Sequence, residues 1–362
     1  MVHFVAPDFN PEAMNKTATR PRKCAKQGNS YIADEKEYNK KKEKKIDLMF
    51  RRFTYRLIVL LVICSVFEQK AKAQEYPWLL QYVTNMHTIN PAYVGIWDKA
   101  GVLLSSRTNW VGVHGAPLTQ YLGYFTPIKD QRSGVGLSIK QLNMGREKRI
   151  FLTGDYSFQV RIDLTHFLRF GLRAGIANFD NNLTEYQLYP DRIPDSEFTS
   201  DIRMYYMTTF GIGAVFFTED YYIGFSVPQI INNSFSVVRS DYSSLYDFKT
   251  AFLSVGYVFG FNRTVFLRPN LLIAATIGEP VYADASAIVY LPNDLQFGLN
   301  LRSNGTVCFS GQYSFRNNIR IGFAADYAAI SDIRKYQVGT YEVLIGYDFN
   351  IYKRKYTKPH YF

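Results

Sequence analysis

The sequence has few cysteines and histidines, and its main body lacks a long apolar run. Its 362 residues include 3 Cys and 5 His. After Gln74, no apolar run approaches the ~20 residues that a transmembrane helix needs. His87, His114 and His166 lack metal-ligand spacing to Cys or to another His, and no G-x-S-x-G motif occurs. We therefore expect no metal, no cofactor and no enzymatic activity. A membrane-embedded hydrolase stays open as the weakest alternative, since a catalytic triad is recognised by its geometry and not by its sequence.

The positive charge is unevenly distributed. The formal net charge is +11, yet residues 74–362 hold 26 Lys and Arg against 23 Asp and Glu. A nucleic-acid-binding domain would need a clustered basic face, and the main body has none. We therefore expect no nucleic-acid partner.

A secretory leader is indicated at residues 49–73. Three arginines follow Met49, an uncharged and mostly apolar run fills 57–67, and Ala-Lys-Ala at 71–73 has the A-x-A form of a cleavage site. The mature chain is expected to begin at Gln74. Residues 1–48 then have no evident role: they are either the product of a wrongly chosen upstream start codon, which we favour, or a real cytoplasmic extension.

Cleavage of this leader would leave a single cysteine. Cys24 and Cys64 precede Gln74, and Cys308 is the one that remains. An exported protein with one cysteine has no internal disulfide. Its stability must then come from burial or from a closed sheet, and Cys308 is read as a small side chain inside the molecule.

The main body alternates with period two, which indicates β-strands with two different faces. In 294–302, Asp, Gln, Gly, Asn and Arg alternate with Leu, Phe, Leu and Leu. The same pattern recurs in 132–140, 167–176 and 318–327. A soluble sandwich also alternates, but these strands run to ~10 residues, the length typical of outer-membrane barrels.

The strands and their connections predict an all-β fold, an antiparallel outer-membrane β-barrel of about 14 strands spanning residues 99–350. The expected strands lie near 101–111, 119–127, 132–142, 149–160, 167–178, 206–216, 220–228, 248–259, 264–275, 281–291, 294–302, 305–315, 317–329 and 337–350. Every second link is short, and the other links include the two longest. Short turns would face the periplasm, and an even strand count returns both ends of the barrel there.

Two segments flank the predicted barrel. Residues 74–98 are not strand-like and contain Asn90-Pro91, a turn signal, followed by Gly95. They are either a turn leading into the barrel or a plug or docking segment, since a lumen of this size cannot be filled by wall side chains alone. The basic, aromatic tail 351–362 is either a solvated overhang, which we favour, or a periplasmic contact for an acidic partner.

Two motifs carry a resemblance to a known family. The first, QY-x-x-N-x-x-x-x-NPA-x-x-G, spans residues 81–95, and the second, R-x-x-W-x-G-x-x-G-A-P-x-T, spans residues 107–119. Together they resemble the PorP/SprF outer-membrane proteins of the type IX secretion and gliding machinery, and the similarity extends over essentially all of 74–362. It implies a fourteen-stranded barrel without catalysis. The implied partners are outer-membrane lipid, periplasmic ring components and secreted adhesins with a type B C-terminal domain.

The residues expected to shape the barrel mouth or bind partners come from these motifs. They are Asn90, Pro91, Gly95, Arg107, Trp110, Gly112, Gly115, Ala116, Pro117 and Thr119. Arg107 could instead pair with a lumenal acid such as Asp155 or Asp326, and Trp110 could belong to an aromatic girdle. The 112–117 stretch could fold into the lumen. The functional alternative to a secretion component is a porin-like channel for small solutes, which would need an open lumen.

Overall fold

The structure of the chain is a computed structural model. It describes residues 78–97, 99–128, 132–185, 201–230, 249–261, 264–277, 279–329 and 338–349. The expected extension 1–48, the leader 49–73 and the tail 351–362 lie outside the described residues.

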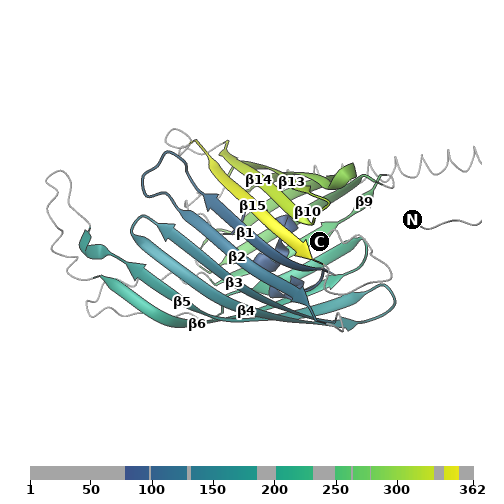
Figure 1. The fold of residues 1–362 in the computed structure, drawn as a ribbon, viewed down its shortest axis with the longest axis horizontal. Coiled ribbons are helices and arrows are strands. Elements are labelled where there is room, and N and C mark those ends of the chain that lie inside the picture. Colours follow the sequence, from purple (N-terminus) through teal and green to yellow (C-terminus); the bar gives the residue numbers. More distant parts are fainter. Residues whose placement is uncertain are drawn as a thin grey trace, which may run out of the picture. The chain divides into compact units, whose positions relative to one another are not determined.

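The described chain forms one closed antiparallel sheet (Figure 1). Its strands are β1 (Ala100–Thr108), β2 (Leu118–Pro127), β3 (Ser133–Met144), β4 (Glu147–Arg161), β5 (Phe167–Asn181), β6 (Ile202–Phe217), β7 (Tyr221–Val227), β8 (Thr250–Tyr257), β9 (Phe259–Gly260), β10 (Phe266–Thr276), β11 (Tyr282–Leu291), β12 (Leu295–Arg302), β13 (Thr306–Ser314), β14 (Ile319–Ala328) and β15 (Thr340–Phe349). Neighbours in sequence pair with each other, and β15 pairs with β1 to close the ring. Because β9 continues β8 alongside β10, the ring has 14 strand positions. The predicted barrel is confirmed.

The alternation of the sequence places apolar side chains outside and polar ones inside. On β12, Leu299 is 39% exposed on the outer face, whereas Asn300 is 2% exposed and faces the lumen. On β5, Phe170 points outward and Arg169 inward. Successive side chains of a strand point to opposite faces, so an apolar outer band follows directly from the period-two pattern. The facing predicted from sequence is confirmed on these strands.

The two ends of the barrel differ in their connections. At the end where β1 begins and β15 ends, here called the terminal end, the links are short, as in 218–220 and 315–318. At the opposite, loop end, the links include the two longest, 182–201 and 228–249. The tight β3–β4 turn at 145–146 is a short link on the loop end. The difference between the ends matches the predicted alternation of link lengths.

Three short 3-10 turns precede β1 and lie within the ring of strands (Figure 1). They are η1 (Tyr82–Thr84), η2 (Met86–Thr88) and η3 (Pro91–Tyr93); η4 (Leu183–Glu185) and η5 (Pro292–Asp294) belong to links between strands. Apolar side chains of the first three turns pack with Phe252, Leu272 and Ile288 of the wall in a buried cluster. Among the residues described, no helix has the length and apolarity to cross a membrane.

Candidate functional site: the segment inside the barrel

Residues 78–97, here called the lumenal segment, run through the barrel from one end to the other. Trp78 packs edge-on against Phe252 and Tyr282, with ring centroids 5.3 and 5.2 Å apart, near the loop-side ends of β8 and β11. Trp97 lies under the guanidinium of Arg320, 4.8 Å from ring centroid to Cζ, at the terminal-side start of β14. The described part of 74–98 therefore lies within the ring of strands.

Arginines of the barrel wall hold the backbone of this segment. Four of them donate to its carbonyls: Arg107 to Trp78, Arg268 to Val83, Arg173 to His87 and Thr88, and Arg169 to Val94. All four are buried, at 9% exposure or less. Buried carbonyls outside regular ladders need partners, and a charged donor makes a stronger hydrogen bond than a neutral one. The wall therefore recognises the backbone of the segment, largely independently of its side chains.

A carboxylate completes this arrangement at the start of the segment. Glu342 accepts hydrogen bonds from the backbone N–H groups of Leu80 and Gln81, and from the side-chain amide of Gln81. In the register of β1 with β15, Glu342 lies opposite Arg107. The two strands that close the barrel thus bind both a backbone carbonyl and backbone N–H groups of the segment.

Arg107 lies beside a lumenal acid and the lumenal segment. Arg107 is 1% exposed and contacts the lumenal segment, so it does not lie at an exposed rim. The acid opposite it is Glu342, whereas the expected partner Asp155 binds Arg173, with Nε to Oδ1 at 2.6 Å. The other expected partner, Asp326, accepts a hydrogen bond from Arg302. Asp155 and Asp326 are buried as Glu342 is, but strand register places Glu342 directly opposite Arg107.

The Asn90-Pro91-Ala92 motif is a capped turn fixed to the wall. Asn90 is the N-cap of η3, its Oδ1 accepting from the Ala92 N–H at 2.9 Å. Asn is a preferred N-cap residue, and Pro fits the first helical position, where its missing N–H costs nothing. The Asn90 Nδ2 donates to the carbonyls of Ala214 on β6 and Phe225 on β7, both at 3.3 Å. One side chain therefore shapes the turn and attaches it to two strands.

Glycines of the wall let the segment approach the strands closely. A Cβ at Gly171 of β5 would lie 2.2 Å from the Ala92 nitrogen, and one at Gly134 of β3 would lie 2.3 Å from the Val94 carbonyl oxygen. Gly95 has φ +68°, and its own Cβ would lie 2.6 Å from the Gly134 Cα. Contacts below 3 Å are not available to a real Cβ, so these positions accept only glycine without movement of the backbone. These glycines of β3 and β5 form a groove for residues 92–95, and glycine at lumen-facing positions of the strands is its sequence signal.

The second motif divides between the barrel interior and the loop end. Arg107 and Thr119 lie opposite each other on β1 and β2, each 1% exposed. Between them, the 109–117 loop carries Trp110, Gly112, Gly115, Ala116 and Pro117. Trp110 (φ 46°), Gly112 (φ 101°) and Gly115 (φ 75°) adopt left-handed backbone conformations, which glycine takes readily and tryptophan rarely.

The middle of the 109–117 loop, residues 112–115, is exposed, whereas Asn109 and Pro117 at its ends are buried. Gly112 and Gly115 are exposed, and the loop bonds sideways to neighbouring links. The Val111 N–H donates to the Gly339 carbonyl at 2.9 Å, and the Gly145 N–H donates to the Gly115 carbonyl at 2.8 Å. These backbone bonds hold the loop against adjacent hairpins. The residues expected to form one site thus lie in two places. Asn90, Pro91, Gly95 and Arg107 lie inside the barrel, and the loop with Trp110 lies at its end.

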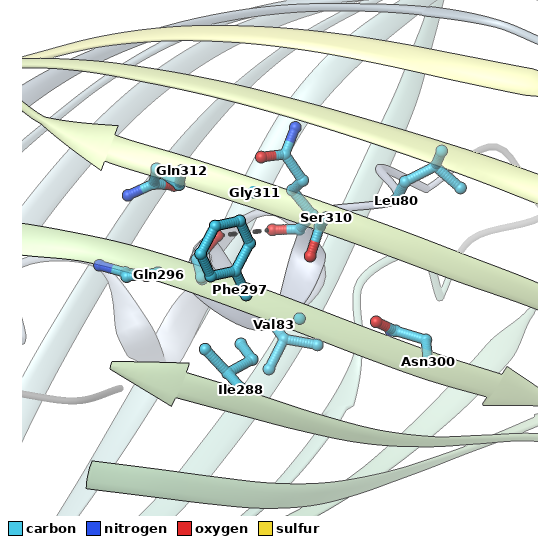
Figure 2. A pocket seen from close by; sticks show the side chains of 12 residues that line it. Leu80, Val83, Ile288, Gln296, Phe297, Asn300, Ser310, Gly311 and Gln312 are labelled. Atoms are coloured by element: carbon cyan, nitrogen blue, oxygen red, sulfur yellow. Dashed lines mark hydrogen bonds between the residues drawn. The ribbon is translucent and has the colours of Figure 1, made fainter. Parts of the chain in front are cut away.

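Little space remains between the segment and β11–β13. Figure 2 shows Leu80 and Val83 of the segment facing Ile288, Asn300 and Ser310 of the wall. The cavity there measures about 10 Å³, near the smallest volume that holds one water molecule. A second cavity, of about 20 Å³, lies by His87, Trp97 and Lys99. On these sides the lumen is packed.

The electrostatics of the interior favour a neutral His87. Burial lowers the pKa of His87 well below its usual value, and the positive charges of Arg320 and Arg173 lower it further. Its Nε2 is buried without a hydrogen-bond partner, and its ring lies 3.8 Å from that of Phe125, centroid to centroid. Within the described ranges, no three His, Cys, Asp or Glu side chains gather as a metal site.

A comparison with protein families agrees with the motifs. The sequence model of a family described as type IX secretion system membrane protein PorP/SprF matches residues 71–347. No curated protein matches the chain. Similar solved structures include a Pseudomonas aeruginosa FadL homologue (13% identity, covering 76% of this chain and 95% of that one, TM-score 0.42) and the Pseudomonas putida toluene transporter TodX (12%, 76% and 95%, 0.42). Another is Acinetobacter baumannii Omp33 (8%, 70% and 98%, 0.40).

Proposed function

Because the chain belongs to the PorP/SprF family of type IX secretion system membrane proteins, we propose that it acts in the outer membrane as a docking component of that machinery. It does not serve as an open channel. The observation that carries the proposal is the lumenal segment, held from opposite sides of the ring. Arg107 on β1 binds one of its carbonyls, and Ser226 on β7 donates to the Ile89 carbonyl at 2.9 Å. A segment fixed in this way leaves the two ends of the barrel as the surfaces for partners.

The two ends are assigned by the length of their links. Outer-membrane barrels have short periplasmic turns and longer external loops, so the terminal end faces the periplasm and the loop end faces outward. Export by the leader 49–73 supports the same orientation. Periplasmic ring subunits of the secretion system then dock at the terminal end. A secreted adhesin with a type B C-terminal domain meets the loop end, which assists its secretion or surface anchoring.

The alternative, a porin-like channel, requires a lumen open to solutes. Purified mature protein reconstituted in planar bilayers should give no large steady conductance. In a strain lacking the gene, partner secretion should fail and be restored by the wild-type gene. Ring subunits should also co-purify with the protein from outer membranes. Large steady conductance, together with undisturbed secretion in the strain lacking the gene, would establish a porin-like channel and contradict this proposal.

A further inference from the structure

A third cavity lies on the loop side of the lumenal segment. Its floor is formed by Trp78, Leu79, Thr88 and Ile89 of the segment, and its walls come from β2–β6, β8 and the residues after β7. Its volume is about 120 Å³. A dry cavity of about 150 Å³ holds a benzene molecule, so this one has room for a single apolar side chain. It lies at the end that the proposed function assigns to secreted partners.

The wall of this cavity carries a cation that lacks a counter-ion. The Lys140 Nζ lies 4.9 Å from the centroid of the Phe151 ring. Among the described residues, no carboxylate oxygen lies within 4.0 Å of it. The other cation of the lining, Arg173, is bound to Asp155 with its Nη2 2.8 Å from Oδ2. The cavity is therefore positive, and its unpaired ammonium favours an anion.

A second polar group of the lining also lacks a partner. Thr209 is 5% exposed, and its Oγ1 is buried without a hydrogen bond. The neighbouring hydroxyls are satisfied, since Ser138 and Thr153 bond to each other at 2.7 Å. Leaving a buried polar group unpaired costs free energy, so a ligand that supplies its partner is favoured. The rings of Trp78, Tyr121, Phe151 and Phe252 form the apolar remainder of the lining.

From these contacts we propose that the cavity binds a carboxylate that stands next to an apolar side chain, presented by a polypeptide at the loop end. The carboxylate pairs with Lys140, and the apolar group packs against the aromatic rings. This inference rests on the proposed function for the protein nature of the ligand. The shared chemistry has two sources: the C-terminal residue of a partner, or an acidic residue beside an apolar one within its chain.

Binding of short peptides to the purified mature protein in detergent tests this inference. The probe is a fluorescent Gly-Gly-Ser-Leu peptide, compared with its C-terminal amide and with Gly-Gly-Glu-Leu-Ser amide, which carries only an internal carboxylate. Whichever carboxylate source is correct should bind about tenfold more tightly than the uncharged amide, as expected for one charge-assisted hydrogen bond. Equal binding of all three peptides, or binding of none, would overturn the inference.

Matched variants locate the binding. Lys140→Met should lose the preference for the charged peptide, and Lys140→Arg should keep most of it. Lys148→Met removes the same charge from an exposed position of β4 and should change nothing. If Lys140→Met and Lys148→Met bind alike, the cavity is not the site. Glu75 lies just before the segment in sequence and could compete for the same cavity. If Glu75→Gln as a single change raises peptide affinity tenfold, the chain's own acid is the occupant and the inference fails.

The proposed function can survive failure of this inference. If Lys140→Met secretes partners normally while deletion of the gene blocks secretion, the docking role stands and the cavity plays no part in it. If deletion itself leaves secretion unchanged, the proposed function fails, whatever the peptides do.

Discussion

Arg107 and Glu342 face each other across the seam where the last strand of the barrel meets the first, and both bind the segment inside. Arg107 donates to the carbonyl of Trp78, and Glu342 accepts from the N–H of Leu80. Pairing of β1 with β15 completes the barrel, so closure brings the donor and the acceptor together around the segment. Barrel closure and capture of the lumenal segment are therefore expected to be one cooperative event.

Arg107→Met should destabilise the folded barrel. The methionine side chain keeps an apolar stem of similar length, but it lacks the donor to the Trp78 carbonyl and the charge that faces buried Glu342. Breaking one partner of a buried charged arrangement costs ~3–5 kcal/mol. The measurement is the temperature at which the barrel loses its compact form in heat-modifiability gels. Arg161→Met, at an exposed position near the terminal end, is the matched control and should shift this temperature little; equal shifts would contradict the role given to Arg107.

Gly171→Ala should displace the lumenal segment. Its new Cβ would meet the Ala92 nitrogen at 2.2 Å and the Pro91 carbonyl carbon at 2.4 Å, both backbone atoms that cannot swing aside. We expect conductance in planar bilayers, or protease cleavage within 78–97, that wild-type protein does not show. Gly154→Ala on β4 is the control, since its Cβ would point outward with the nearest atom at 3.8 Å. A Gly171→Ala barrel as closed and protease-resistant as wild type would show that the groove is not required.

Stability should fall in mild acid because of His87. Its pKa in the folded protein lies below the value of about 6.5 for an unfolded chain, so the unfolded state binds more protons. Stability is then complete above about pH 7.5 and declines by up to ~1.4 kcal/mol per pH unit below about pH 6.5. His87→Gln cannot take up that proton and should show a flatter profile between about pH 7.5 and 5. Unfolding temperatures measured across this range decide it; identical slopes for the two proteins would exclude His87 as the cause.

The sequence was sufficient for the wall of the barrel but not for its interior. Alternation determines which face a residue occupies, so Leu299 outside and Asn300 inside follow from the pattern. The interior depends on contacts between residues far apart in sequence, such as Arg268 with Val83, which periodicity does not encode. Facing the lumen also suggests that Asn300→Arg is harmless. The structure contradicts this, because Asn300 donates to Asp284 at 3.2 Å in a nearly filled cavity beside Val83.

The arrangement of the candidate residues could not be predicted from sequence, although their local turn chemistry could. Asn90, Pro91 and Gly95 were recognised by their turn chemistry, and that chemistry is what the structure uses. Arg107 and Trp110 are three residues apart in one motif, yet one is buried in the lumen and the other lies in a loop. The boundary between them is the end of β1 at Thr108, and boundaries are the least certain part of a sequence-based prediction. A double substitution at both positions would therefore mix two effects.

Trp110→Ala alone should separate partner binding from barrel assembly. Trp110 follows the end of β1, makes no contact that holds the lumenal segment among the described interactions, and sits in a loop braced by Gly339 and Gly145. Tryptophan is a frequent anchor at interfaces, and truncating such an anchor costs ~2 kcal/mol of binding or more. We expect wild-type amounts of heat-modifiable barrel but reduced secretion or surface retention of the partner, with Trp110→Phe retaining most of it. Barrel abundance and partner secretion are measured in the same cells. If both fall together, the tryptophan supports the barrel itself, and if neither changes, the loop has no part in docking.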